Sequence, residues 1–381
     1  MIYLDAAATT KPHQRVIEAM MPYFTEKWYN PSSLYEKGNK VKEDIEKARK
    51  TVADYIGADS NEIFFTSGGS ESNCMAIRGF VDYWISKGLE PCVITTLIEH
   101  KSVVSCVDNL NDTNIHYVGV DENGFVDLQK LDTLLRYNEL HPTLVSIQHA
   151  NNEIGTIQDI KSISKLVHRY GATLHTDSVQ AFGQLPIDVN DLGIDMLSAS
   201  GHKIYAPKGI GFLYKRNEVE IKPLIYGSQM DGMRGGTENV PYIIGMAKAV
   251  KLIRNDKELG IRLSLLRDNF ISQLKAIGCK VNGSIDKRLP NNISVVLPDN
   301  AMGESILYML DMSGIFVSTG SACNSKSIEP SYVLKAIGLS DEEANKTIRI
   351  TLPNDTEADE IDKAVCEIKK QIKLLSMEDN F

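Results

Sequence analysis

The sequence predicts an α/β fold, with a mostly parallel mixed sheet flanked by helices in a large domain and a smaller α+β domain at the C-terminal side. Three observations carry this prediction. The chain of 381 residues is too long for one ordinary hydrophobic core. Between residues 50 and 215, short β-rich runs alternate with helical patterns, which is typical of a parallel sheet. After residue 260, long helical stretches surround only two clear strand patterns.

The elements follow in chain order. Apolar residues recur at three- and four-residue steps from Val41 to Tyr55, which predicts an amphipathic helix whose lysine-rich face is solvated. Seven β-rich runs then predict strands at residues 62–66, 92–96, 115–120, 144–148, 173–176, 196–199 and 211–214. Residues 241–278 predict a long helical stretch divided near Gly260. Residues 292–297 and 347–352 predict further strands, and residues 357–375 a closing helix.

We place the domain boundary near the middle of that helical stretch. The large domain is expected to comprise residues 15–259. The smaller domain is expected to comprise residues 1–14 and 260–381, including a cysteine-bearing segment described below.

Composition limits the possible functions. The net charge of -9 argues against direct binding of nucleic acid through its phosphates. No apolar run approaches the length of a membrane span, and residues 1–5 lack the basic flank of a signal peptide. Six scattered cysteines without a Cys-x-x-Cys pair argue against a zinc ribbon, a redox dithiol or a disulfide framework. We therefore expect a soluble, cytoplasmic protein.

Two predicted strands end in residues of complementary chemistry. The first ends in Asp177, and the second runs to Gly201 and places Lys203 just beyond it. A pyridoxal phosphate site needs such a pair, since the lysine forms a Schiff base and the carboxylate keeps the pyridinium nitrogen protonated. A lone lysine is usually a solvated surface amine. The pairing is what favours a cofactor site.

A strand, a glycine turn and a helix follow one another in residues 64–73. Gly69 and Ser70 stand where the helix begins, so free backbone N–H groups and the helix dipole favour an anion there. A plain turn with an N-cap explains the same residues equally well. The segment fits neither a Walker loop nor Gly-x-Gly-x-x-Gly, so a nucleotide is not favoured.

Two further polar groups follow strand ends. His100 is either a core or surface histidine, or a ring that stacks on an aromatic cofactor and moves protons. Asn151 lies in an amide-rich segment, residues 148–156, that either contacts a planar ligand or forms an Asx turn.

One thiol stands in a small, polar, glycine-containing segment, residues 318–325. Structural cysteines prefer apolar surroundings, as Cys92 beside Val93 and Ile94 illustrates. Cys323 is therefore either accidental on an exposed loop or a nucleophile, and composition leaves both possibilities open.

Together and in this order, these segments resemble a cysteine desulfurase of the NifS/IscS type, in the class-V aminotransferase-like branch of the fold-type-I pyridoxal phosphate enzymes. The resemblance runs from residues 3–10 through residues 30–33 and 234–240 to residues 348–350. It includes Cys323 in its Ser-Ala-Cys context.

The resemblance implies pyridoxal 5'-phosphate as the cofactor. Lys203 would hold the cofactor covalently and shuttle a proton, Asp177 would pair with the pyridine nitrogen and Gln180 would reach the phenolic oxygen. His100 would stack on the ring. The phosphate would be bound by Gly69, Ser70, Ser200 and His202, and by Thr237 from the partner subunit of a homodimer.

The resemblance also implies the substrate and the product. Asn30, Asn151 and Arg349 would bind L-cysteine, and a guanidinium suits a carboxylate because its planar fork matches two oxygens. Cys323 would take the sulfur as a persulfide, leaving L-alanine. A sulfur-acceptor protein of iron–sulfur cluster assembly or tRNA thiolation would then receive it.

Several positions depart from the family's pattern, namely Tyr35, Met230, Asp231 and Pro353, and they leave the acceptor and the cleft edge open. Two alternatives remain. One is a selenocysteine lyase or another β-lyase on the same scaffold, although simple elimination needs no nucleophilic cysteine. The other is a catalytically silent docking partner for sulfur-transfer proteins.

Overall fold

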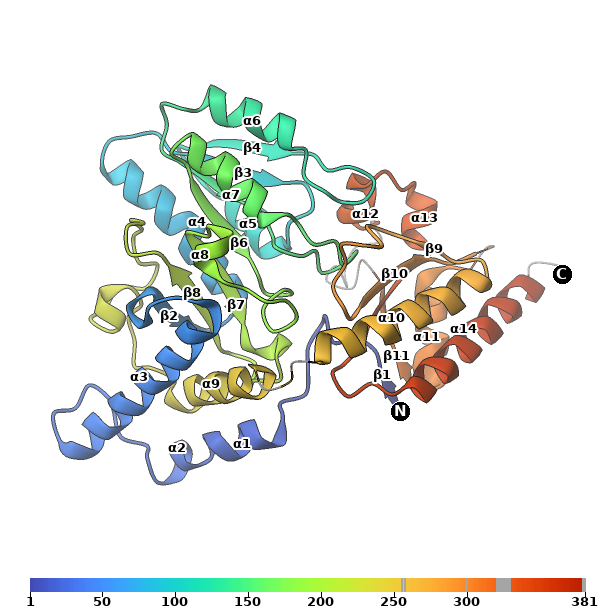
Figure 1. The fold of residues 1–381 in the computed structure, drawn as a ribbon, viewed down its shortest axis with the longest axis horizontal. Helices are drawn as coiled ribbons and strands as arrows, with labels where there is room; N and C mark the ends of the chain where they lie inside the picture. Colours follow the sequence, from blue (N-terminus) through green and yellow to red (C-terminus); the bar gives the residue numbers. More distant parts are fainter. Residues whose placement is uncertain (255, 257, 299–300, 320–329, 379–381) are drawn as a thin grey trace.

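The computed structural model describes residues 1–254, 256, 258–298, 301–319 and 330–378. Figure 1 shows two bodies side by side, one built around a large twisted sheet and the other around a smaller sheet beside the C-terminal helix. The N-terminal segment passes from the second body to the first.

The first body contains a seven-stranded sheet in the order β2-β8-β7-β6-β5-β3-β4. Its strands are β2 (Ile63–Thr66), β3 (Cys92–Thr96), β4 (Asn114–Val118), β5 (Thr143–Ser146), β6 (Thr173–Asp177), β7 (Met196–Ser200) and β8 (Gly211–Lys215). Only β8 runs antiparallel to its neighbours. The predicted α/β fold with a mostly parallel mixed sheet is confirmed, and all seven predicted strands are present within two residues at each end.

Helices flank this sheet. They are α1 (Gln14–Met20), α2 (Pro22–Thr25), α3 (Glu36–Ile56), α4 (Gly69–Ser86), α5 (Lys101–Asp108), α6 (Leu128–Tyr137), α7 (Ile160–Arg169), α8 (Val189–Leu192) and α9 (Val240–Arg254). Every residue of β2, β3 and β7 is buried. This burial explains why the strands are apolar runs rather than alternating patterns. The lysine-rich stretch is α3, which buries its apolar face and ends at Gly57 in the left-handed region.

The second body contains a four-stranded sheet in the order β12-β13-β10-β9. Its strands are β9 (Lys280–Val281), β10 (Asn292–Val296), β12 (Ser318–Thr319) and β13 (Thr347–Thr351), and its helices are α10 (Leu259–Ala276), α11 (Gly303–Met312), α12 (Tyr332–Ala336), α13 (Asp341–Asn345) and α14 (Ala358–Glu378). The long helical stretch breaks between α9 and α10, about one turn before Gly260, where the sequence predicted the break. Gly260 lies inside α10, where a Cβ would meet open space, so nothing there forces a break.

Buried hydrophobic side chains form two large clusters. The first runs from Val16 to Val250 and adds Leu289, while the second joins Leu4 to residues between Leu259 and Ile372. We propose that these clusters correspond to two domains with the boundaries expected from the sequence.

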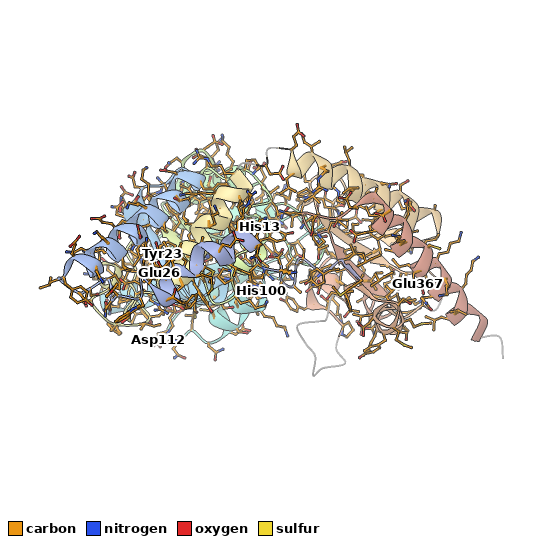
Figure 2. The ribbon with its side chains drawn as sticks, turned by 90° about the horizontal axis from the view of Figure 1, so that it is seen from below. His13, Tyr23, Glu26, His100, Asp112 and Glu367 are labelled. Carbon is orange, nitrogen blue, oxygen red and sulfur yellow. The ribbon has the colours of Figure 1, made fainter. Side chains whose placement is uncertain are left out.

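The N-terminal segment connects the two clusters. Strand β1 (Ile2–Tyr3) pairs in parallel with β11 (Ile315–Phe316) of the second body. A few residues later, Thr10 donates its backbone N–H to the carbonyl of His202 in the first body. Figure 2 shows His100 near the centre of the molecule, between Tyr23 of α2 and Glu367 of α14. The predicted site therefore lies close to the junction of the two bodies.

Among the helices that the structure describes, none has the length and apolar character needed to cross a bilayer.

Candidate active site

A cavity of about 350 Å³ opens where β6 and β7 end. Nine of the predicted site residues line it: Gly69, Ser70, His100, Asp177, Gln180, Ser200, His202, Lys203 and Arg349. Carboxyl ends of neighbouring parallel strands meet at one edge of a sheet, which is why residues far apart in sequence converge there.

Lys203 reaches the cavity from a tight 3-10 turn directly after β7. A Cβ at Gly201 would lie 2.7 Å from Cγ2 of Ile210, so only glycine fits the start of this turn. The Nζ atom donates to the backbone carbonyls of Ala7 and of Ala8, the latter at 2.8 Å. The N-terminal segment therefore holds the amine at the cavity wall.

Asp177 ends β6 and is 6% exposed. Its Oδ1 accepts the backbone N–H of Val179 at 2.9 Å, and its Oδ2 accepts an N–H of the Asn73 side chain at 2.7 Å. A buried carboxylate is costly unless such donors surround it. The two bonds fix the direction in which the carboxylate faces the cavity.

His100 is the N-cap of α5, and its Nδ1 accepts the backbone N–H of Ser102 at 3.1 Å. The neutral ring therefore carries its proton on Nε2. Burial lowers the pKa of His100, and the positive charge of Lys203 acts in the same direction, while Asp177 opposes both. The ring is neutral at neutral pH, which suits stacking on a planar cofactor.

The start of α4 forms an anion cradle. Gly68 has a φ of 155°, a conformation that favours glycine, and a Cβ at Gly69 would lie 2.6 Å from Cγ2 of Val179. Gly68 is the N-cap and offers no side chain to cap the helix, and Glu71 accepts the backbone N–H of Ser67, just before it, at 2.8 Å. Glu71 in the first turn is paired with Arg234, with 2.9 Å between Nε and Oε1. The backbone N–H groups and the helix dipole therefore face the cavity without an unpaired negative charge beside them.

His202 also lines the cavity. Burial lowers the pKa of His202 to about 4, and the neighbouring Lys203 adds to this effect. The imidazole is therefore neutral, and its Nδ1 lies 3.2 Å from the hydroxyl of Thr9. Gln180 donates from Nε2 to the carbonyl of Ala7 at 3.1 Å.

These groups fit pyridoxal phosphate. The cradle at Gly69 suits its phosphate, the carboxylate of Asp177 suits its pyridine nitrogen, and the amine of Lys203 suits its aldehyde. Asn73 also lines the cavity, and its buried Oδ1 has no hydrogen-bond partner among the described residues. Such an atom indicates a polar ligand.

Arg349 brings a guanidinium from the second body. It stands in the middle of β13 opposite Ser294 and Ser318, and its Nη2 lies 2.8 Å from Oδ1 of Asp5. The carbonyl of Asn152 accepts a second N–H at 3.3 Å. Its Nε is buried without a partner among the described residues. The two bonds above use one N–H each of Nη1 and Nη2, so the second N–H of each remains for a substrate carboxylate.

Three predicted substrate or cofactor residues lie away from this cavity lining. Asn151 closes an Asx turn, with its Oδ1 accepting the N–H groups of Glu153 and Ile154, while Asn152 lines the cavity instead. Asn30 is exposed and accepts the N–H of Ser32. Thr237 is exposed as well. Their roles stay predictions, and Cys323 lies outside the described residues.

Sequence reasoning missed Asn73 and Asp5. Asn73 donates to both Asp177 and Ser102, and so joins β6, α4 and α5. The available signal was a polar residue directly before the apolar stripe of a predicted helix, and the structure shows this residue fully buried. Asp5 was part of the resemblance but received no role, because its partner Arg349 is 344 residues away.

Two buried acids lie behind the cavity. Glu99 accepts the Thr96 hydroxyl at 2.6 Å and the N–H of Gln148, and burial raises its pKa to about 8. Glu153 accepts the Ser331 hydroxyl at 2.5 Å, and burial raises its pKa to about 7. Ser331 is the N-cap of α12, so its hydrogen bond to Glu153 attaches that helix to the first body.

Comparison with known proteins agrees with this geometry. The aminotransferase class-V family matches residues 2–364. A cysteine desulfurase IscS of Dictyoglomus turgidum is 47% identical, covering 92% of this chain and 89% of the relative, and one of Methanosarcina thermophila is 43% identical, covering 98% and 93%.

Solved structures agree as well. A NifS-like protein has a TM-score of 0.91 at 34% identity, covering 98% of this chain and 99% of that protein. A protein described as SspA in complex with cysteine has a TM-score of 0.82 at 36% identity, covering 93% and 99%.

Fold and cavity together define a pyridoxal-phosphate-dependent enzyme of fold type I. Within that class, the chain belongs to the class-V aminotransferase family, on its NifS/IscS-like cysteine desulfurase branch. The predicted resemblance and the predicted cofactor are confirmed.

Asn73→Ala removes the amide that holds Asp177. A hydrogen bond to a charged group contributes about 1.5–3 kcal/mol, so the dissociation constant for pyridoxal phosphate should rise roughly tenfold or more. Titration of the apoenzyme with the cofactor measures this. Asn269→Ala, on the exposed face of α10, is the control and should bind as the wild type does; equal affinities for the two variants would contradict the role of Asn73.

Glu99→Gln tests the buried acid. Because the folded-state pKa is about 8, above the ordinary 4.5, the folded protein binds more protons than the unfolded chain between these values. This contribution to stability is present below pH 4.5 and is lost as pH rises to 8, at roughly 1.4 kcal/mol per pH unit. Denaturant unfolding from pH 5 to 8 should show this slope reduced in Glu99→Gln and unchanged in the exposed control Glu122→Gln. An identical slope in both variants would exclude a raised pKa at Glu99.

Proposed function

We propose that the protein removes the sulfur of L-cysteine, holds it as a persulfide on Cys323 and passes it to an acceptor protein. The enzyme is a pyridoxal-phosphate-dependent cysteine desulfurase, the activity for which its relatives are named. A cysteine complex of a structural neighbour supports the same substrate.

One observation carries this proposal. The amine of Lys203, the carboxylate of Asp177 and the guanidinium of Arg349 line a single cavity, although they come from β6, the turn after β7, and β13. A catalytically silent docking protein has no use for this convergence. A simple β-lyase needs no nucleophilic cysteine, which disfavours the alternative of a selenocysteine lyase.

Pyridoxal phosphate, when bound, supplies an electron sink for the charge that develops when the substrate Cα loses its proton. Lys203 stands at the cavity wall, where its amine would move that proton once substrate replaces it. Arg349 would bind the substrate carboxylate with N–H groups that are fixed by Asp5 and by the carbonyl of Asn152. Neutral His100 would cover the ring and offer its Nε2 proton.

The sulfur transfer itself is assigned to Cys323 by the family resemblance. Its thiolate attacks the substrate sulfur, a new S–S bond forms, and the bond between the substrate Cβ and sulfur breaks. The products are a persulfide on Cys323 and, after protonation, L-alanine. According to the resemblance, the Cys323 thiol must approach both the cavity, to receive the sulfur, and the acceptor protein, to pass it on.

The acceptor belongs either to iron–sulfur cluster assembly or to tRNA thiolation, and the enzyme would work as a homodimer. Thr237 is exposed, which is compatible with the expectation that it reaches the phosphate of a partner subunit. The departures at Tyr35, Met230, Asp231 and Pro353 lie outside the cavity lining, so they bear on partners rather than on the chemistry.

Cys323→Ala tests the persulfide step, with Cys366→Ala on α14 as the matched control. The Cys323 variant should keep the yellow colour of the holoenzyme, whereas its rate of sulfide and L-alanine formation from L-cysteine should fall at least 100-fold, which corresponds to roughly 3 kcal/mol in the activation barrier.

Lys203→Ala tests the cofactor linkage and should lose the absorption band of the lysine-linked cofactor. Normal turnover by Cys323→Ala would refute the sulfur-transfer assignment, and an unchanged spectrum of Lys203→Ala would refute the cofactor linkage.

A further inference from the structure

Two cysteines that are 32 positions apart meet between helices. Cys74 on α4 and Cys106 on α5 have their sulfur atoms 3.2 Å apart. The sequence argued against a redox dithiol because no Cys-x-x-Cys pair exists. Helix packing creates the pair instead, since α4 and α5 lie against each other.

The pair is reachable from one side. Cys74 is half-buried, whereas Cys106 is buried. A covalent S–S bond is about 2 Å long, so closure requires the sulfurs to approach by about 1 Å. A reagent would therefore meet Cys74 first, and Cys106 would act second.

The pKa of Cys74 is lower than that of Cys106, as expected if Cys74 reacts first and Cys106 second. The hydrogen bond from Cys106 lowers the pKa of Cys74 to about 7, and the positive charge of Arg78, one turn further along α4, acts in the same direction. The same hydrogen bond and burial raise the pKa of Cys106. At neutral pH Cys74 therefore has substantial thiolate character, while Cys106 keeps its proton.

The pair adjoins the candidate active site. Asn73, directly before Cys74, donates to Asp177 and to Ser102 of α5. Both helices begin at the cavity, α4 at Gly69 and α5 just after His100. The dithiol therefore joins the two helices that carry the phosphate cradle and the stacking histidine.

We propose that Cys74 and Cys106 form a second sulfur-reactive site, which reduces sulfane sulfur to sulfide and closes to a reversible disulfide. The inference rests on the proposed function in one respect, namely that persulfide made by the enzyme is the source of the sulfane sulfur. The site itself rests on the geometry of α4 and α5.

The reaction balances in two steps. The Cys74 thiolate attacks the outer sulfur of a persulfide R–S–SH; the S–S bond of the donor breaks, R–S⁻ leaves, and Cys74 becomes a persulfide. The Cys106 sulfur then loses its proton and attacks Sγ of Cys74, and HS⁻ leaves. Two thiols are oxidised to one disulfide, and one sulfane sulfur is reduced to sulfide.

The test uses the reductant-free holoenzyme and inorganic polysulfide, without L-cysteine. After alkylation under denaturing conditions and digestion without reductant, mass spectrometry should find most of Cys74 and Cys106 in one cross-linked peptide pair, lighter by two hydrogen atoms than the separate peptides. Dithiothreitol should restore both thiols. Cys74→Ser should leave Cys106 as an alkylated thiol, and Cys279→Ser, in the other hydrophobic cluster, should keep the cross-link.

Recovery of both cysteines as separate alkylated thiols would overturn the proposal, and so would a stable persulfide on Cys74 beside a free Cys106. Because no L-cysteine is present, this outcome is independent of desulfurase activity. Failure of the proposed function would appear instead as absent sulfide release from L-cysteine.

Discussion

The buried carboxylate of Asp177 is the group on which the site depends. A charge that is only 6% exposed at a strand end is stable only where hydrogen-bond donors surround it. The chain supplies the N–H of Val179 and the amide of Asn73. Because Asn73 also donates to Ser102, the group that satisfies this one charge also joins α4 to α5 and to β6, and the cavity-lining residues Gly69 and His100 stand at the starts of these two helices.

The N-terminal segment imposes the second constraint, since it joins both bodies at the cavity. Residues before Leu4 belong to the second body through the pairing of β1 with β11. Asp5 then fixes Arg349, and the carbonyls of Ala7 and Ala8 hold Lys203. One short stretch of chain therefore sets the spacing between the amine of Lys203 and the guanidinium of Arg349 at the cavity wall.

A second set of polar contacts, made by Glu99 and Glu153, attaches α12 to the first body. Glu153 accepts the hydroxyl of Ser331, and the carbonyl of Glu99 accepts the hydroxyl of Tyr332 at 2.6 Å. Both acids are buried with raised pKa values, so protonation stabilises them where a charge would be costly. Apolar contacts of Ile98 and Ile154 with α12 and α13 complete this attachment.

The sequence by itself determined the strand positions, the placement of Asp177 and Lys203 at neighbouring strand ends, and the family, because apolar runs, strand-end chemistry and motif order are local properties. Tertiary structure alone decided which polar groups meet. Asp5 reaches Arg349 and Asn73 reaches Asp177 over 344 and 104 positions, and Cys74 meets Cys106 although no sequence spacing indicates it. The same limit applies to Asn151, whose amide closes a turn while its neighbour Asn152 lines the cavity. Contacts of this kind depend on how helices pack and how strands register, which no short stretch of sequence encodes.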